Sequence, residues 1–412
     1  MTLRLYNTKG RSVQDFRPIK DGEVKMYCCG PTVYNYAHIG NLRSYVFEDT
    51  LRRTLELFDY TVEHVMNVTD VGHLTDDADE GEDKIIKSAR EMGKTVWDIA
   101  EFFTDAFFKD TDALNILRPT VICRATDHVK EMIELIQRIE AKGYTYQAGG
   151  NVYFDTQRFP EYGKMALLDR QEEQQSRVDV DENKRNPRDF VLWFTKSKFE
   201  HQAMLWDSPW GRGYPGWHIE CSAMSMKYLG EEFDIHCGGV DHIPVHHTNE
   251  IAQAESVTGH EWVHYWLHGE FLVVDAGKMS KSRGGFITLS SLVEDGFDPL
   301  DYRYFCLGGH YRTQLQFSFD ALQQARNARL NVMDRLDLLR REVAGQDASP
   351  EVSDTPAFMD SETRAEGYRR QFREGLSEDL NVPKAVAVLW TAIKDQELLA
   401  SHRLELAEWM DR

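Results

Sequence analysis

The chain contains 412 residues, of which 42% are hydrophobic and 28% charged, and it carries a formal net charge of −20. This length predicts two or three domains with a sizeable core, while the acidic surface disfavours polyanionic partners except at local basic patches. Because no apolar run approaches the ~20 residues of a membrane span and no signal segment opens the chain, we expect a cytoplasmic protein without membrane contact.

The first part of the chain has the pattern of a β-α-β unit. Residues 24–28 are typical of a buried strand, residues 42–58 of a helix with one apolar face, and residues 60–68 of a β-branched strand. A second strand–turn–helix pattern covers residues 233–257. Because a strand–helix–strand crossover joins parallel strands, the sequence predicts an α/β fold with a Rossmann-like parallel sheet.

Other patterns interrupt and follow this sheet. The charge-rich and turn-rich residues 121–203 predict a connective insertion between two halves of the catalytic domain, residues 1–120 and 204–268. Residues 269–318 form a third region, which contains a lysine-bearing loop. Beyond it, apolar residues recur at helical spacing, so residues 319–412 are expected to form an all-α bundle.

Four potential metal ligands come from three places in the chain. His246 and Glu250 lie four apart on a predicted helix and therefore share one face. Cys29 follows the first strand, where α/β sheets place ligands, and Cys221 opens a predicted helix. The six cysteines are scattered, which is typical of free thiols or metal ligands. The set suits zinc, with a solvated helix face and buried thiols as the alternatives.

The stretch "AHIGNLRSY" (37–45) stands between the first strand and its helix. Such a junction binds phosphate well, because free backbone N–H groups and the helix dipole point at it. Gly40 would let the backbone approach a phosphate closely, and His38 could donate a hydrogen bond to it. Asn41 could do the same, or it could serve only as the N-cap of the helix.

The stretch "GKMSKSRGG" (277–285) has glycines at both ends and two lysines, Lys278 and Lys281. Lys281 could neutralise the charge that develops on a departing pyrophosphate, which stabilises a transition state electrostatically. The alternative is a flexible surface turn. Each stretch alone is weak evidence, but the two together, in this order and this far apart, are highly specific.

The two stretches resemble the signatures of class I aminoacyl-tRNA synthetases. With "MYCCGPTVY", "RATDH", "NKRNPRDFVLW", "PGWHIECSAM" and "HHTNEIAQ", the chain resembles the bacterial cysteinyl-tRNA synthetase family from Leu3 to its end. The resemblance implies L-cysteine, Mg-ATP and tRNA(Cys) as substrates and favours a monomer. It also implies one catalytic zinc ion, whose ligands would be Cys29, Cys221, His246 and Glu250.

The resemblance also suggests which residues line the substrate pocket. Trp217 would pack over the bound amino acid, or it is simply a core tryptophan. Thr69 and Asp241 would hold the ammonium group or the ribose, and the sequence does not divide these two roles between them. Gly238 and Gly239, at the turn that follows a strand, would let the nucleotide approach.

Three points of the resemblance stay open. The first signature ends in Asn41, where its reference form has histidine. Family members usually continue into a small module that reads the anticodon, and a chain that ends at Arg412 is expected to lack it. A related ligase that joins cysteine to an amino sugar in mycothiol synthesis is the closest alternative, and a non-catalytic paralogue that binds RNA or a partner is a second one.

Overall fold

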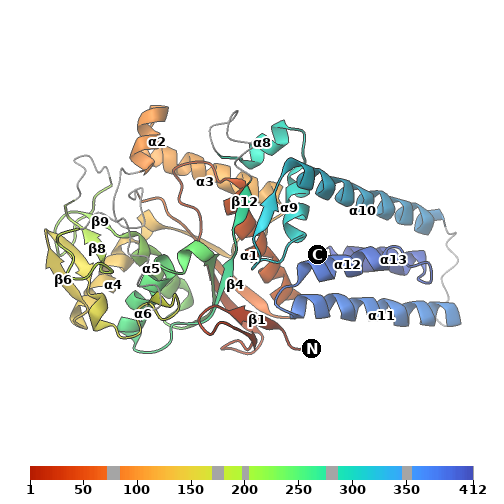
Figure 1. Cartoon of the computed structure of the whole chain (residues 1–412), viewed down its shortest axis with the longest axis horizontal. Helices are drawn as coiled ribbons and strands as arrows, with labels where there is room; N and C mark the ends of the chain where they lie inside the picture. The colour runs from red at the N-terminus through yellow and green to blue at the C-terminus, as the bar shows by residue number, and fades with distance from the viewer. Residues whose placement is uncertain (72–83, 169–180, 197–203, 275–285, 346–354, 412) are drawn as a thin grey trace.

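The computed structural model consists of an α/β body with a smaller sheet at one end and a bundle of long helices at the other (Figure 1). The bundle projects away from the body, so the molecule is elongated along the direction of these helices. The structure describes residues 1–71, 84–168, 181–196, 204–274, 286–345 and 355–411.

The body is built on a five-stranded parallel sheet with the order β11-β10-β3-β4-β5. The chain runs outward from β3 to β5 and then returns to place β10 on the other side of β3. The direction of winding therefore reverses between β3 and β10, and such a reversal opens a crevice at the carboxyl ends of the two strands. This topology confirms the predicted Rossmann-like fold class. The strands are β3 (Glu23–Cys28), β4 (Thr61–Val68), β5 (Val121–Arg124), β10 (Phe233–Gly239) and β11 (Val263–Gly269).

Helices cover both faces of the sheet. Because successive side chains of a strand point to opposite faces, Met26 and Cys28 of β3 belong to the core under α1 and α3, whereas Tyr27 and the following Cys29 belong to the core under α4, α5 and α6. These helices are α1 (Ile39–Leu57), α2 (Lys84–Met92), α3 (Val96–Ala113), α4 (Val129–Ala141), α5 (Trp217–Leu229) and α6 (His246–Thr258).

A separate antiparallel sheet, with the order β6-β7-β8-β9, takes three of its strands from the predicted insertion. Two strands lie in one predicted region but belong to the sheet of the other. β5 (Val121–Arg124) is the edge strand of the parallel sheet, and β9 (Tyr214–Pro215) pairs with β8 before the chain enters α5. The antiparallel strands that precede β9 are β6 (Thr145–Ala148), β7 (Asn151–Phe154) and β8 (Phe190–Phe194).

The remaining elements join the body to the bundle. A hairpin, β1 (Arg4–Asn7) and β2 (Ser12–Asp15), lies at the N-terminus, and the parallel pair β12 (Leu272–Val274) and β13 (Leu315–Phe317) brackets α8 and α9. Within the described residues, no helix is both long and apolar enough to cross a membrane. The helices of this half are α8 (Leu289–Glu294), α9 (Pro299–Leu307), α10 (Phe319–Gly345), α11 (Pro356–Ser377), α12 (Val382–Ala392) and α13 (Ala400–Met410).

Candidate active site

A cavity of about 400 Å³ opens at the carboxyl ends of β3 and β10, at the reversal of the sheet winding. Its wall combines segments that are far apart in the sequence: the loop after β3, the first turns of α1, the start of α5 and the turn after β10. The predicted site residues on this wall are Cys29, His38, Asn41, Thr69, Trp217, Cys221, Gly238, Gly239, Asp241 and His246.

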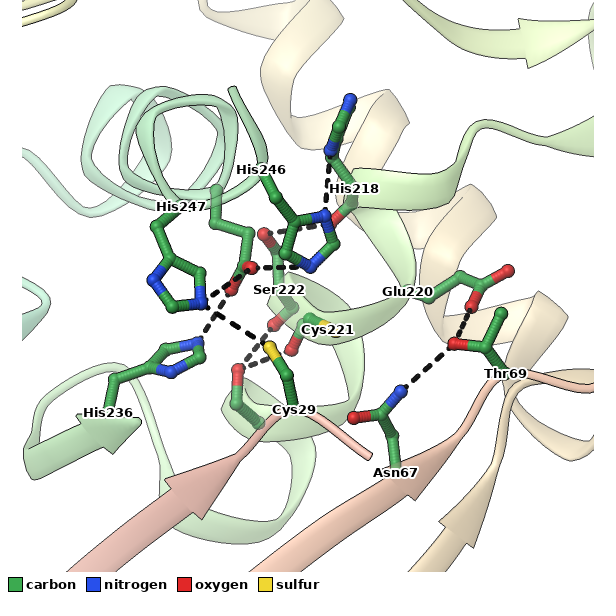
Figure 2. Close-up of polar contacts among 12 residues, drawn as sticks. Cys29, Asn67, Thr69, His218, Glu220, Cys221, Ser222, His236, His246 and His247 are labelled. Atoms are coloured by element: carbon green, nitrogen blue, oxygen red, sulfur yellow. Dashed lines mark hydrogen bonds and ion pairs between the residues drawn. The ribbon is translucent and has the colours of Figure 1, made fainter. Parts of the chain in front are cut away.

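The four predicted metal ligands meet at one edge of this cavity. Cys29 follows β3, Cys221 lies in the second turn of α5, and His246 and Glu250 lie one turn apart on α6 (Figure 2 labels all but Glu250). Their ligand atoms all lie within 4.8 Å of one another, and all four residues are buried. The structure thus brings together in space four residues that are up to 221 positions apart.

The donor set and its geometry fit a zinc ion. Two thiols, an imidazole and a carboxylate are all groups that bind zinc in proteins. Glu250 is fully buried, and its two oxygens pair with His246 Nε2 at 2.9 Å and with His236 Nε2 at 2.8 Å. A cation among these groups would take the place of the proton that His246 and Glu250 share.

Neighbouring groups favour the deprotonated forms of Cys221 and Glu250, whereas burial raises the pKa of the Cys29 thiol well above its usual value. The hydrogen bond from Cys29 lowers the pKa of the Cys221 thiol to about 7, against the effect of burial. Burial alone would raise the pKa of Glu250, but His236 and His246 lower it to about 2. Burial would lower the pKa of His246, but Glu250 and Cys221 raise it to about 10. Metal binding would therefore displace a proton from His246.

A second group of potential ligands overlaps the first and consists of Cys29, His236, His247 and Glu250. His236 Nε2 is hydrogen-bonded to Glu250 Oε2 at 2.8 Å, and His247 Nε2 lies 3.4 Å from Cys29 Sγ. Cys221 and His246 belong to the cavity wall, whereas His236 and His247 do not. An ion held by the first group is therefore the one that a molecule in the cavity could reach.

The first signature forms the N-terminus of α1 through a reciprocal cap. His38 Nδ1 accepts a hydrogen bond from the Asn41 backbone N–H at 3.1 Å, and Asn41 Oδ1 accepts one from the His38 backbone N–H at 3.2 Å. Because Nδ1 accepts, a neutral His38 carries its proton on Nε2, which is then free to donate. Burial lowers the pKa of His38 and so favours this neutral form. The N-cap is therefore His38 and not Asn41, which takes part in the cap from the third helical position.

Two glycines of the site permit close approaches that a side chain would block. A Cβ atom on Gly40 would lie 2.9 Å from the ring of His38, so glycine lets this histidine fold back over its own helix. A Cβ atom on Gly238 would lie 2.5 Å from His242 Nδ1. Larger residues at either position would displace a histidine that lines the cavity.

Two residues that were not among the predicted site residues, Asn67 and Glu220, hold Thr69. The Thr69 hydroxyl donates to Glu220 Oε2 at 3.0 Å and accepts a hydrogen bond from Asn67 Nδ2 at 3.1 Å (Figure 2). Asn67 Oδ1 accepts a hydrogen bond from the Gly30 backbone N–H at 2.9 Å. These contacts tie the loops after β3 and β4 to α5. The only signal in the sequence was position, since Glu220 directly precedes Cys221.

Trp217 lies over the metal ligands rather than in the core. Its ring centroid is 4.4 Å from that of His246, and it lines the cavity. The predicted residues Lys278 and Lys281 lie outside the described residues. Phe286, which follows them, stacks on His38 with 5.6 Å between ring centroids.

Comparisons with known proteins agree with this geometry. The family model described as the catalytic domain of class I (C) tRNA synthetases matches residues 15–327. A cysteine–tRNA ligase of Treponema denticola is 55% identical over 419 residues, which cover 100% of this chain and 85% of the relative. The corresponding ligase of Borrelia hermsii is 49% identical over 410 residues, covering 99% and 84%.

Among solved structures, methionyl-tRNA synthetase of Mycobacterium tuberculosis in complex with methionyl-adenylate superposes with a TM-score of 0.64. The alignment covers 94% of this chain and 88% of that one at 16% sequence identity, so it supports the fold. From the family model and the full-length identities, the chain belongs to the cysteine–tRNA ligase family of class I aminoacyl-tRNA synthetases.

Proposed function

We propose that the chain activates L-cysteine with Mg-ATP and transfers the cysteinyl group to the 3′ end of tRNA(Cys). The observation that carries this proposal is the convergence of Cys29, Cys221, His246 and Glu250 where a parallel sheet reverses, with the first three of these residues on the wall of the cavity. The names of the relatives support tRNA, rather than an amino sugar, as the acceptor.

We infer that the resident metal is zinc, held by those four residues. A zinc ion there supplies a position that prefers a thiolate ligand and that a serine hydroxyl fills poorly. This preference matters because an apolar pocket alone rejects such a near-isostere only about 10²-fold. Trp217, which packs on His246, would cover the bound amino acid and exclude water from it.

The phosphates of ATP would lie at the N-terminus of α1. His38 Nε2 and the free backbone N–H groups of the first turn are donors for phosphate oxygens, and Gly40 leaves room for them. Lys278 and Lys281 would neutralise the departing pyrophosphate. Thr69 already donates to Glu220, so we assign the contact with the ammonium group or the ribose to Asp241 and a positioning role to Thr69. Gly238 and Gly239 would let the nucleoside approach β10.

The reaction needs no covalent nucleophile from the protein. A carboxylate oxygen of cysteine attacks the α-phosphorus of ATP, and the bond to pyrophosphate breaks. A terminal ribose hydroxyl of the tRNA then attacks the carbonyl carbon of the adenylate and releases AMP. The protein positions the reactants and neutralises charge.

The regions outside the catalytic sheet would serve the tRNA. We propose that the part of residues 121–203 that follows β5 contacts its acceptor end, that residues 269–318 carry the second signature and contact the stem, and that the bundle, residues 319–412, lies along the side that leads to the anticodon. Because these substrates are those of protein synthesis, we propose the cytoplasm as the place of action.

The test is cysteine-dependent exchange of labelled pyrophosphate into ATP, with serine as the control amino acid. Exchange with cysteine alone, lost on chelation of the metal and restored by zinc, is the expected result. The same preparation should then charge tRNA(Cys) and should not form an amide with an amino sugar. A folded, zinc-loaded protein that gives no exchange would contradict the proposal and favour a non-catalytic role.

A further inference from the structure

Glu48, on α1, is a buried carboxyl group on the wall of the candidate active site. Glu48 is only 1% exposed, and neither Oε1 nor Oε2 makes a geometrically good hydrogen bond to a described residue. The thiol of Cys28, which is a weak donor, contacts this carboxyl group and lowers its pKa against the larger effect of burial. Native proteins rarely bury a polar group in this way, because its lost hydration is not repaid.

The position of Glu48 separates it from the metal centre. His38, Asn41, Ser44 and Glu48 follow one another at helical spacing on α1, and all line the cavity. This face of α1 covers the side of the sheet to which Cys28 points, whereas Cys29 and Cys221 belong to the core on the other side. The cavity therefore continues past the end of the sheet, from the metal ligands, where the side chain of the substrate cysteine would bind, to Glu48.

The walls around Glu48 are aromatic. Tyr45, on the same helix, and Phe103 and Phe107, on α3, line the cavity with it, and the ring centroids of Tyr45 and Phe107 are 4.7 Å apart. Aromatic walls suit a flat ring, and base–aromatic stacking is a common source of affinity for nucleotides. A flat ring with polar atoms on its edge could bring those atoms to the carboxyl group of Glu48.

We propose that Glu48 hydrogen-bonds the adenine base of ATP and so determines the nucleotide specificity of the enzyme. The chemistry of the two groups is complementary. A carboxylic acid has one O–H donor and one carbonyl acceptor, and adenine presents an amino donor next to a ring-nitrogen acceptor. Burial raises the pKa of Glu48 and so favours the protonated form that can make both bonds.

This inference rests on the assignment of the cavity to ATP and cysteine. Two variants and one analogue test it in the pyrophosphate exchange assay. Glu48→Met keeps the side-chain length and removes both polar atoms, so the KM for ATP should rise about 10-fold, with the KM for cysteine unchanged. Glu48→Gln keeps a donor and an acceptor, so its KM should rise less than about threefold.

Purine riboside triphosphate, which lacks the 6-amino group of ATP, identifies the contact. The wild-type protein should bind this analogue more weakly than ATP, but by a smaller factor than Glu48→Met costs, because the analogue keeps the ring nitrogen and loses only one of the two hydrogen bonds. The variant should not distinguish the two nucleotides. The control is Glu56→Met, because Glu56 lies on the same helix but is exposed, pairs with Arg52 and does not line the cavity. It should leave both KM values unchanged.

Other results would overturn the inference. An unchanged KM for ATP in Glu48→Met would give Glu48 no nucleotide contact. A rise only in the KM for cysteine would move the contact to the amino acid, and a rise only in the KM for tRNA would move it to the terminal adenosine. Calorimetric titration of ATP into the same proteins tests the contact without catalysis. A wild-type protein that binds ATP but shows no exchange would contradict the proposed function while still measuring the effect of Glu48.

Discussion

Cys28 and Cys29 are adjacent residues at the end of β3 that face opposite sides of the parallel sheet. The alternation of side chains along a strand points Cys28 at the core under α1 and Cys29 at Cys221 and α6. A sequence that contains two neighbouring cysteines does not say which face a metal will occupy. The partners of Cys29 decide it, since Cys221 and His246 both come from helices on that face.

Cys221→Ser tests the metal set at the residue scale. Replacing a ligand should cost more zinc affinity than the ~10–100-fold that loss of an outer partner costs, so purified protein should contain little zinc and activate cysteine poorly. Zinc content after gel filtration and pyrophosphate exchange measure the two effects. Stoichiometric zinc in this variant would point instead to the set with His236 and His247.

The matched control is Cys123→Ser. Cys123 is also a buried thiol of the same core, but it donates a hydrogen bond to the Met66 carbonyl and does not line the cavity. Serine can keep that hydrogen bond, so this variant should retain zinc. Loss of zinc from both variants would mean that the core, and not the ligand, had failed.

At the scale of elements, α1 carries both a feature that the sequence predicted and one that it did not. The pattern of apolar residues predicted a helix over 42–58, and the observed helix begins three residues earlier because His38 and Asn41 cap it. The first signature and the parallel sheet follow from local patterns, and the set of metal ligands follows from the family resemblance, but the strand order was not predicted. Glu48 and Glu220 were not predicted either, because their roles depend on neighbours that the fold brings from other segments.

Arg43 is a further residue whose role depends on segments that are distant in the sequence. Although buried within α1, its guanidinium donates to the backbone carbonyls of Glu270, Phe271, His310 and Thr313, with distances of 2.7 Å to Glu270 and 2.5 Å to Thr313. These carbonyls precede β12 and β13. Arg43 therefore fixes the helix of the first signature to the strand that leads into the second signature.

Arg43→Met should lower the free energy of unfolding by about 3 kcal/mol, because several carbonyl oxygens lose a charged donor at once. Arg43→Lys should recover little of it, since an ammonium group cannot reach carbonyls spread around a planar fork. Urea denaturation measures both. Arg370→Met, at an exposed arginine of α11, is the control and should change stability by less than about 0.5 kcal/mol. Equal losses of stability in Arg43→Met and Arg370→Met would contradict the role of Arg43 in fixing α1 to β12.

At the scale of the whole molecule, Asp379 joins the helical bundle to the catalytic body. It lies between α11 and α12 with a left-handed backbone (φ 58°). Its carboxylate accepts hydrogen bonds from the Tyr6 backbone N–H at 2.8 Å, from the Tyr311 hydroxyl at 2.7 Å and from Arg312 Nε at 2.6 Å. Two segments of the body, one in β1 and one just before β13, thus meet at one residue of the bundle, and no local pattern in the sequence predicted this junction.

Asp379→Asn should separate the two steps of the reaction. Asparagine tolerates the left-handed backbone but loses the ionic bond with Arg312, so we expect about 1–3 kcal/mol of destabilisation and a looser junction. Pyrophosphate exchange uses only the cavity and should stay within about twofold of wild type, whereas tRNA charging needs the bundle and the cavity in a fixed relation and should fall about 10-fold.

The control for this prediction is Asp395→Asn. Asp395 accepts hydrogen bonds from Arg364 Nε at 2.5 Å and from the Tyr368 hydroxyl at 2.8 Å, so its partners all lie inside the bundle. Its loss should destabilise the bundle without changing the ratio of charging to exchange. If Asp379→Asn lowered exchange as much as charging, the junction would act on the cavity itself. If neither rate changed, the position of the bundle would not depend on this residue.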